Sequence, residues 1–266
     1  MMGNFFERIG STVIGTSQQV TGVLALFVDT LYWIFIGPFR KKAAKRQSIF
    51  EQMLFVGVQS ILIVFFVTLF TGIVIAMQTA PQLESLGAVI YVAGLVAVSI
   101  TRELGPVLTG LVIAGRVGAA MSAELGTMKV TEQVEALESM ALNPVRFLVV
   151  PRFLALIIML PCLTILGDAV GIFGGYLIGV FNLHINPGLY IDTTFRFLTA
   201  KDILTGVAKS FVFGGIIALI GCYYGLNTTG GAEGVGKSTT TSIVTSFILI
   251  IVADCILTAA FFFTNV

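Results

Sequence analysis

Two ionisable residues, Arg102 and Glu103, stand side by side in a stretch that is otherwise almost wholly apolar, residues 86–117. Charges at bilayer depth are costly, and they usually face a bundle interior or a water-filled cavity on a substrate or ion pathway. Because neighbouring residues on a helix project about 100° apart, these two side chains should reach different groups. The pair therefore predicts a binding site inside a membrane protein, and the alternative is a structural ion pair between helices.

Three further ionisable residues lie deep in apolar segments, and each needs a partner there: Asp168, Lys209 and Asp254. Lys209 is a suitable interhelical partner for Glu103. Together with Arg102, these two would form a polar patch in an otherwise apolar cavity, which suits a ligand with a charged head and apolar tails. We assign Asp168 and Asp254 as structural intramembrane charges.

The composition is that of a polytopic membrane protein, because 56% of the residues are hydrophobic and only 11% are charged, against about a quarter in soluble domains. No stretch is long and polar enough for a separate soluble core, so we predict one membrane domain over residues 1–266. It would comprise an N-terminal interfacial region, 1–46, and a five-span bundle, 47–266. The net charge of +1 and the lack of a basic footprint argue against a nucleic-acid partner. The three cysteines lack metal-site spacing, so we expect no bound metal.

Five apolar segments meet the roughly 20 residues that a helix needs to cross a membrane. They lie near residues 53–77, 87–117, 147–182, 203–226 and 242–264. The second and third are too long for one straight crossing, and Pro106 favours a kink directly after the charged pair. The predicted fold class is an all-α integral membrane protein with five transmembrane helices.

Residues 20–37 form a further apolar run that contains Asp29 and ends in aromatic residues. Its short length, its acid and its interfacial aromatics favour an elbow helix parallel to the membrane over a sixth span. Lysine and arginine residues near span ends orient the bundle, so the basic run from Arg40 to Arg46 should be cytoplasmic. Five crossings then place the C-terminus on the opposite side.

The longest connection between spans, residues 121–146, shows the 4, 3, 4 apolar spacing of an amphipathic helix, at Val130, Val134, Leu137 and Ala141. Asn143 and Pro144 should end this helix. We expect a short helix parallel to the membrane that either covers the inner end of the bundle or docks another protein.

Two glycine patterns have different meanings. Gly171, Gly175 and Gly179 recur every four residues, which lets helix backbones approach closely, and we expect packing within the chain. Residues 231–238 satisfy the P-loop pattern letter for letter, but no strand precedes them and no α/β domain surrounds them. We expect a flexible loop there, with the polar residues Ser238 to Thr241 capping the last helix.

Four stretches make the chain similar to the MlaE/YrbE family of permeases, the membrane subunits of MCE-type ABC lipid transporters. They are Thr101-Arg-Glu-Leu-Gly-Pro106, Ala114-Gly-Arg-Val-Gly-Ala-Ala120, Ala123-Glu-Leu-Gly-Thr-Met128 with Thr131-Glu-Gln-Val134, and Gly234-Val-Gly-Lys-Ser-Thr-Thr240. They occur in order at family-like spacing, and the resemblance covers the chain from about residue 46.

The resemblance implies a homodimeric permease of the bacterial inner membrane, with an elbow helix and five spans around a cavity for phospholipid and a periplasmic C-terminus. In such permeases the Arg-Glu of the second span and a lysine of the fourth line the lipid site. The matching residues here are Arg102, Glu103 and Lys209.

The resemblance also implies three partners. A cytoplasmic ABC ATPase would dock on the helix between spans two and three, where we assign Glu124, Lys129, Glu132 and Glu135 to coupling. A STAS-domain protein would bind that ATPase, and a periplasmic MCE-domain hexamer would exchange lipid with the inner membrane, as part of maintaining outer-membrane asymmetry. ATP and Mg²⁺ would belong to the ATPase, so this chain is expected to bind no cofactor and to be no enzyme.

Two alternatives come from other functional classes. An ion-coupled secondary transporter or channel would use Arg102, Glu103, Asp168 and Asp254 to relay protons or cations. A self-contained P-loop enzyme would bind nucleotide on the isolated chain.

Overall fold

The computed structural model describes residues 2–37 and 46–263, and within these residues it is helical and contains no β-strand. Five helical stretches are long and apolar enough to cross a membrane. Their bounds are Arg46–Glu84, Val89–Val130, Val145–Phe181, Ala200–Leu226 and Gly231–Phe263. The prediction of an all-α membrane protein with five spans is confirmed.

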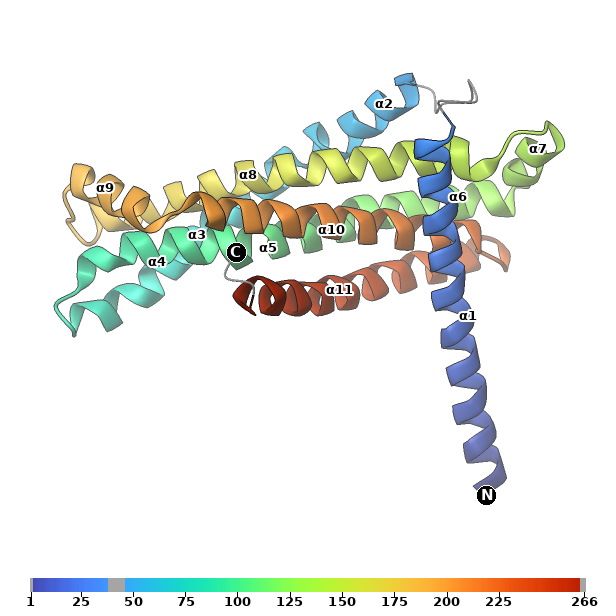
Figure 1. Ribbon diagram of the computed structural model, residues 1–266, viewed down its shortest axis with the longest axis horizontal. Helices are drawn as coiled ribbons and strands as arrows, with labels where there is room; N and C mark the ends of the chain where they lie inside the picture. Colours follow the sequence, from blue (N-terminus) through green and yellow to red (C-terminus); the bar gives the residue numbers. More distant parts are fainter. Residues whose placement is uncertain (1, 38–45, 264–266) are drawn as a thin grey trace.

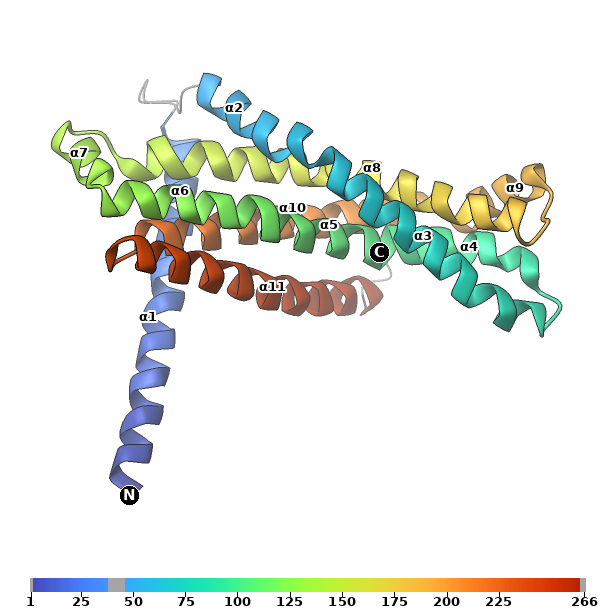
Figure 2. The same cartoon turned by 180° about the vertical axis from the view of Figure 1, so that it is seen from behind.

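The spans lie alongside one another in both views of the molecule (Figures 1 and 2). The first contains α2 (Arg46–Val56), η1 (Val58–Ser60) and α3 (Ile61–Glu84), and the second contains η2 (Val89–Tyr91), α4 (Val92–Ser99), η3 (Ile100–Leu104), α5 (Gly105–Ile113), η4 (Ala114–Gly118) and α6 (Ala119–Val130). The third is η5 (Val145–Val149) with α8 (Val150–Phe181), followed by α10 (Ala200–Leu226) and α11 (Gly231–Phe263). Two short helices, α7 (Gln133–Ser139) and α9 (Pro187–Phe197), connect the second span to the third and the third to the fourth.

The N-terminal helix α1 (Met2–Phe35) runs across the bundle instead of along the spans (Figures 1 and 2). It touches the bundle through aromatic contacts: the rings of Phe27 and Phe153 are 6.3 Å apart, and the Arg146 guanidinium lies 5.8 Å from the Trp33 ring. The helix is longer than the apolar run at residues 20–37, and its placement parallel to the membrane stays a prediction. Most of the basic run, Arg40 to Lys45, lies outside the described residues.

The second span is continuous past Pro106, and the kink expected there stays a prediction. It is 42 residues long, roughly 60 Å at about 1.5 Å per residue, and two five-residue π-helical segments, η3 and η4, interrupt its α-helical pattern. In η3 the Gly105 N–H bonds to the carbonyl of Ile100, five residues back, and Pro106 follows in the first turn of α5. Such π segments often occur at functional sites, and this one carries Arg102 and Glu103.

Glycines make close packing between α3 and α8. A Cβ atom at Gly72 would overlap the Gly171 carbonyl. Gly179 serves the packing of α8 against α9 in the same way, because a Cβ atom there would overlap the Tyr190 ring. The predicted glycine motif therefore packs within the chain, as expected. The main core lies next to this seam, where buried side chains of α8 and α10 such as Leu156 and Phe213 meet the second span.

The P-loop look-alike is part of a helix, so the predicted flexible loop is wrong. The turn before α11 needs only two glycines with positive φ, Gly230 at 90° and Gly231 at 68°, and the helix begins at once. The threonines expected to cap it lie inside it instead: Thr239 and Thr241 each donate to the carbonyl four residues earlier, at 2.8 Å.

The helix expected between spans two and three is shorter than its apolar spacing predicted. α6 continues the second span to Val130, and the chain then reverses at Glu132, which has a φ of 60°. α7 ends at Ser139, and Ala141 lies beyond it with a φ of 57°. Val134 is buried against the bundle, so this short helix does cover the end of the spans.

Candidate functional site

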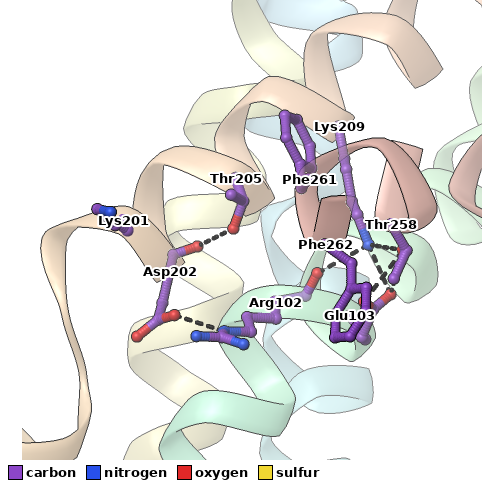
Figure 3. A pocket seen from close by; sticks show the side chains of 9 residues that line it. All are labelled: Arg102, Glu103, Lys201, Asp202, Thr205, Lys209, Thr258, Phe261 and Phe262. Carbon is purple, nitrogen blue, oxygen red and sulfur yellow. Dashed lines mark hydrogen bonds and ion pairs between the residues drawn. The ribbon is translucent and has the colours of Figure 1, made fainter. Parts of the chain in front are cut away.

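A polar cavity of about 140 Å³ opens where η3 meets the start of α10 and the end of α11 (Figure 3). Its walls come from residues far apart in the sequence: Arg102, Glu103, Lys201, Asp202, Thr205, Lys209, Thr258, Phe261 and Phe262. Figure 3 shows the guanidinium of Arg102 turned toward Asp202 and the ammonium of Lys209 turned toward Glu103 and Thr258, with two phenylalanine side chains beside them. The three residues predicted as a binding patch are thus brought together in one cavity.

Lys209 is the centre of this cluster, and its side chain is only 2% exposed. Its Nζ lies 2.6 Å from Oε2 of Glu103, 2.8 Å from Oδ1 of Asp254 and 2.7 Å from Oγ1 of Thr258. A buried ammonium is stable only when it is paired and hydrogen-bonded, and both conditions hold here. The interhelical pair of Glu103 with Lys209 expected from the sequence is confirmed.

Backbone geometry explains why Lys209 points at this place. Pro106 has no N–H, so it cannot bond to the carbonyl four residues earlier, which belongs to Arg102. That carbonyl accepts from Lys209 Nζ instead, at 3.1 Å. The approach of α10 to η3 requires Gly206, because a Cβ atom there would overlap the carbonyl of Thr101.

Arg102 reaches a different group from its neighbour, as the 100° rule predicted. Its Nε donates to Oδ1 of Asp202, whose side chain is 2% exposed. The other oxygen of Asp202 accepts from the backbone N–H and the hydroxyl of Thr199, at 2.8 Å each, and so caps α10. The Arg102 side chain remains 56% exposed, and in the part of the chain that the structure describes only its Nε is engaged.

Sequence reasoning missed four polar residues of the cavity lining: Lys201, Asp202, Thr205 and Thr258. Asp202 could have been found, because Thr199-x-x-Asp202 before an apolar run is a capping-box pattern at the start of a helix. Nothing in the sequence marks Thr258, whose hydroxyl lies 3.1 Å from Oε1 of Glu103. Asp254, which we had set apart as a structural charge, lies against Lys209 and belongs to the cluster.

Asp168 stands apart from this cluster. It is 6% exposed, and neither carboxyl oxygen has a hydrogen-bond or ion-pair partner among the described residues. The side chain packs against Gly105, where a Cβ atom would overlap Oδ1. The expectation that each deep charge finds a partner is therefore wrong for Asp168.

The residues assigned to coupling gather at the far end of the second span. Glu124 lies on α6 and pairs with the buried Arg152 at 2.7 Å. Lys129, also on α6, pairs with Glu135 on α7, and this hydrogen bond holds the pKa of Glu135 below its ordinary value. Glu132 is exposed at the reversal between the two helices. Their role in docking an ATPase stays a prediction.

These features define a polytopic helical membrane protein with a charged cavity between its spans. A family model described as Permease MlaE matches residues 49–260, and the chain belongs to this family. A probable ABC transporter permease protein of Rickettsia typhi is 42% identical over 98% of this chain and 99% of its own length. A probable ABC transporter permease protein of Synechocystis is 46% identical over 79% of this chain and 80% of its own length. The chloroplastic protein trigalactosyldiacylglycerol 1 of Arabidopsis thaliana is 38% identical over 80% of this chain and 61% of its own length.

Proposed function

We propose that this ABC permease subunit moves phospholipid and that the cavity at Arg102 holds the lipid head group. The observation that carries the proposal is the pairing of charges. Lys209 is buried between two carboxylates, those of Glu103 and Asp254. Arg102 engages Asp202 through its Nε alone, so its side chain is more than half exposed at the cavity with its terminal nitrogens available. A guanidinium with two such nitrogens matches the geometry of a phosphate group.

The size and walls of the cavity support a lipid. Pockets for whole drug-sized ligands hold about 300–1,000 Å³, so a cavity of about 140 Å³ has room for a head group only. Apolar tails would have to lie outside, and the neighbouring end of α11 offers a face for them, since Ile256, Phe262 and Phe263 are 63%, 77% and 82% exposed. The name of the Arabidopsis relative contains a diacylglycerol glycolipid, which is compatible with lipid transport by this chain.

The remaining partners belong to the same proposal. ATP hydrolysis would occur on a separate ABC ATPase docked at the turn between α6 and α7, with a STAS-domain protein bound to it. A second copy of this chain would complete the permease in the bacterial inner membrane, and a periplasmic MCE-domain hexamer would exchange the phospholipid. Because one continuous helix joins α6 to η3, a displacement of the docking turn can reach Glu103 and Arg102 directly.

The proposed ion-coupled mechanism has less support than lipid transport. It would require the deep acids to form a relay, but Asp168 has no polar partner among the described residues and is not in the cavity lining. Asp254 and Glu103 are both held by Lys209.

The test is ATP-dependent phospholipid transport in vesicles that contain the permease with its co-purified ATPase. We expect Arg102→Gln to lower the rate at least about tenfold, because charge-assisted hydrogen bonds to phosphate contribute about 1.5–3 kcal/mol. The matched control is Arg196→Gln, which removes an exposed arginine of α9 and should leave the rate unchanged. Wild-type transport by the Arg102 variant would contradict the proposal.

A further inference from the structure

A second π-helical segment of the same span, η4, carries another arginine at its centre, Arg116. The Arg116 guanidinium is held by the first span. Its Nη1 donates to Oγ of Ser60 at 2.6 Å and to the carbonyl of Phe55 at 3.3 Å, and its Nη2 donates to Oε1 of Gln59 at 3.0 Å. The Phe55 ring lies 5.4 Å from the guanidinium carbon. All of these acceptors are neutral.

Arg116 differs in this respect from three other cations of the spans. Arg102, Arg152 and Lys209 each lie within 4.0 Å of a carboxylate, whereas no described carboxylate lies within that distance of Arg116. A partly buried charge without a counterion is costly unless an anion from outside the chain compensates it. The neutral acceptors fix the orientation of the guanidinium but leave its positive charge uncompensated.

An apolar groove of about 420 Å³ begins at this charge. Besides Arg116 it is lined by Ile63 of α3, by Leu111, Val112 and Gly115 of the second span, and by Phe247 of α11. Figure 2 shows the second span running between α3 and α11 on this face of the bundle. Ile63 and Phe247 are 42% and 36% exposed, so the groove opens at the outer surface of the spans. In a membrane, this surface faces lipid.

The distance between the two arginines along the second span can be compared with the thickness of a bilayer. Arg102 and Arg116 are 14 residues apart, which is roughly 20 Å along a helix, against about 30 Å for the hydrocarbon core. Each lies a similar number of residues from its end of the 42-residue span, Val89 or Val130. With the bilayer centred on this span, one arginine would lie in each leaflet, near the depth where phosphate groups begin.

We propose that Arg116 and its groove form a second lipid site, which binds the phosphate of an anionic phospholipid from the leaflet opposite to Arg102, with an acyl chain along Ile63 and Phe247. The occupant is a lipid and not free phosphate, because the rest of the groove is apolar. As a station on a transport path the site rests on the proposed function, but its occupancy can be tested without transport.

The sharpest perturbation leaves Arg116 in place. Gln59→Glu replaces the side-chain amide, whose oxygen already lies 3.0 Å from Arg116 Nη2, with a carboxylate. This carboxylate becomes an internal counterion that competes with phosphate for the guanidinium. The variant gains an ion pair and should fold at least as well as the wild type. Gln82→Glu is the matched control, because it makes the same change at an exposed position further along the first span, in α3.

Native mass spectrometry of the full-length chain in detergent can count bound phosphatidylglycerol, with diacylglycerol of the same acyl chains as the phosphate-free probe. Arg102→Gln is introduced first to empty the other site. We expect one phosphatidylglycerol per chain to remain. Its binding should weaken at least about tenfold after Gln59→Glu and should be unaffected by Gln82→Glu. Arg116→Lys, which keeps the charge but loses the planar fork, should weaken binding in the same direction.

Three results would overturn the second site: loss of all phosphatidylglycerol in the Arg102 variant, unchanged binding after Gln59→Glu, or diacylglycerol binding as tightly as phosphatidylglycerol. These results leave the proposed function standing if Arg102→Gln still lowers the rate of transport. Conversely, normal transport by the Arg102 variant would contradict the proposed function while leaving the binding result at Arg116 intact.

Discussion

Lys209 offers the most decisive test of how the charged cavity is built. Replacing it with methionine keeps the length of the side chain but leaves the carboxylates of Glu103 and Asp254 facing each other without a cation. Removing one partner of a buried pair typically costs about 3–5 kcal/mol. Glu103 is 41% exposed and can be solvated, whereas Asp254 is 20% exposed. We therefore expect Lys209→Met to lower the free energy of unfolding by about 3 kcal/mol, at the low end of that range.

The origin of this loss can be separated from mere loss of packing. If an uncompensated Asp254 carboxylate causes it, adding Asp254→Asn to Lys209→Met should restore about 1–3 kcal/mol, the usual desolvation cost of a buried polar group left without a partner. On the wild-type background, the same Asp254→Asn change should instead destabilise the protein, because Lys209 then keeps only one of its two carboxylates. The two effects have opposite signs, as expected for coupled residues.

Equilibrium unfolding in mixed micelles, followed by far-ultraviolet circular dichroism, measures these four proteins under one condition. The reasoning fails if Lys209→Met unfolds like the wild type. It also fails if Asp254→Asn destabilises both backgrounds equally, since the two side chains would then be energetically independent despite their 2.8 Å separation.

Three other predictions follow from particular contacts. Gly206→Ala should lower the free energy of unfolding by about 1–3 kcal/mol and weaken phospholipid binding, because the new Cβ atom would meet a backbone carbonyl of η3. Gly215→Ala is the control on the same helix. The nearest atom to its Cβ is 3.8 Å away, so neither quantity should change. Lys129→Gln should raise the pKa of Glu135 toward its ordinary value in a ¹³C NMR titration, because the hydrogen bond that lowers this pKa is lost. In the wild type, the stability that the pair contributes is present above the pKa of Glu135 in the unfolded state. It disappears as the pH falls through the lower pKa of Glu135 in the folded state. Val134→Asp should uncouple ATP hydrolysis from transport by detaching α7 from the bundle, and ATPase assays with and without lipid would show undiminished coupling if α7 has no such role.

The sequence was sufficient to predict the five spans, because runs of about 20 apolar residues have few alternatives in water or lipid. It was also sufficient to place Glu103 against Lys209, since two opposite charges in apolar helices must find each other or another partner. The sequence did not predict the local backbone. The glycines of residues 230–236 predicted a loop. Of these, Gly230 and Gly231 have positive φ, whereas Gly234 and Gly236 lie within the helix.

The residues that surround Lys209 in the cluster were harder to predict than the Glu103–Lys209 pair itself. Asp254 and Thr258 are one helical turn apart on α11, and both face Lys209, but nothing in the sequence fixes the rotation of α11 about its axis. Asp168 shows the opposite error. Its position in an apolar run resembles that of Lys209, yet α8 turns it toward the backbone of Gly105. Tertiary rotation of helices, which the apolar pattern leaves undetermined when a helix is apolar on all sides, decides both cases.

The second span shows how one proline links fold to function. Without an N–H at Pro106, the carbonyl of Arg102 is left without its helical partner, and in a membrane no water is at hand to satisfy it. The Lys209 ammonium fills that role and at the same time binds Glu103 and Asp254. The ammonium that satisfies this carbonyl is therefore also held between two carboxylates and has no charge left for a ligand. The exposed guanidinium of Arg102 is then the group in the cavity best placed to receive an anionic ligand. A site assembled in this way depends on the helix irregularity, which is why its geometry should be more sensitive to changes at η3 and Gly206 than to changes in its apolar walls.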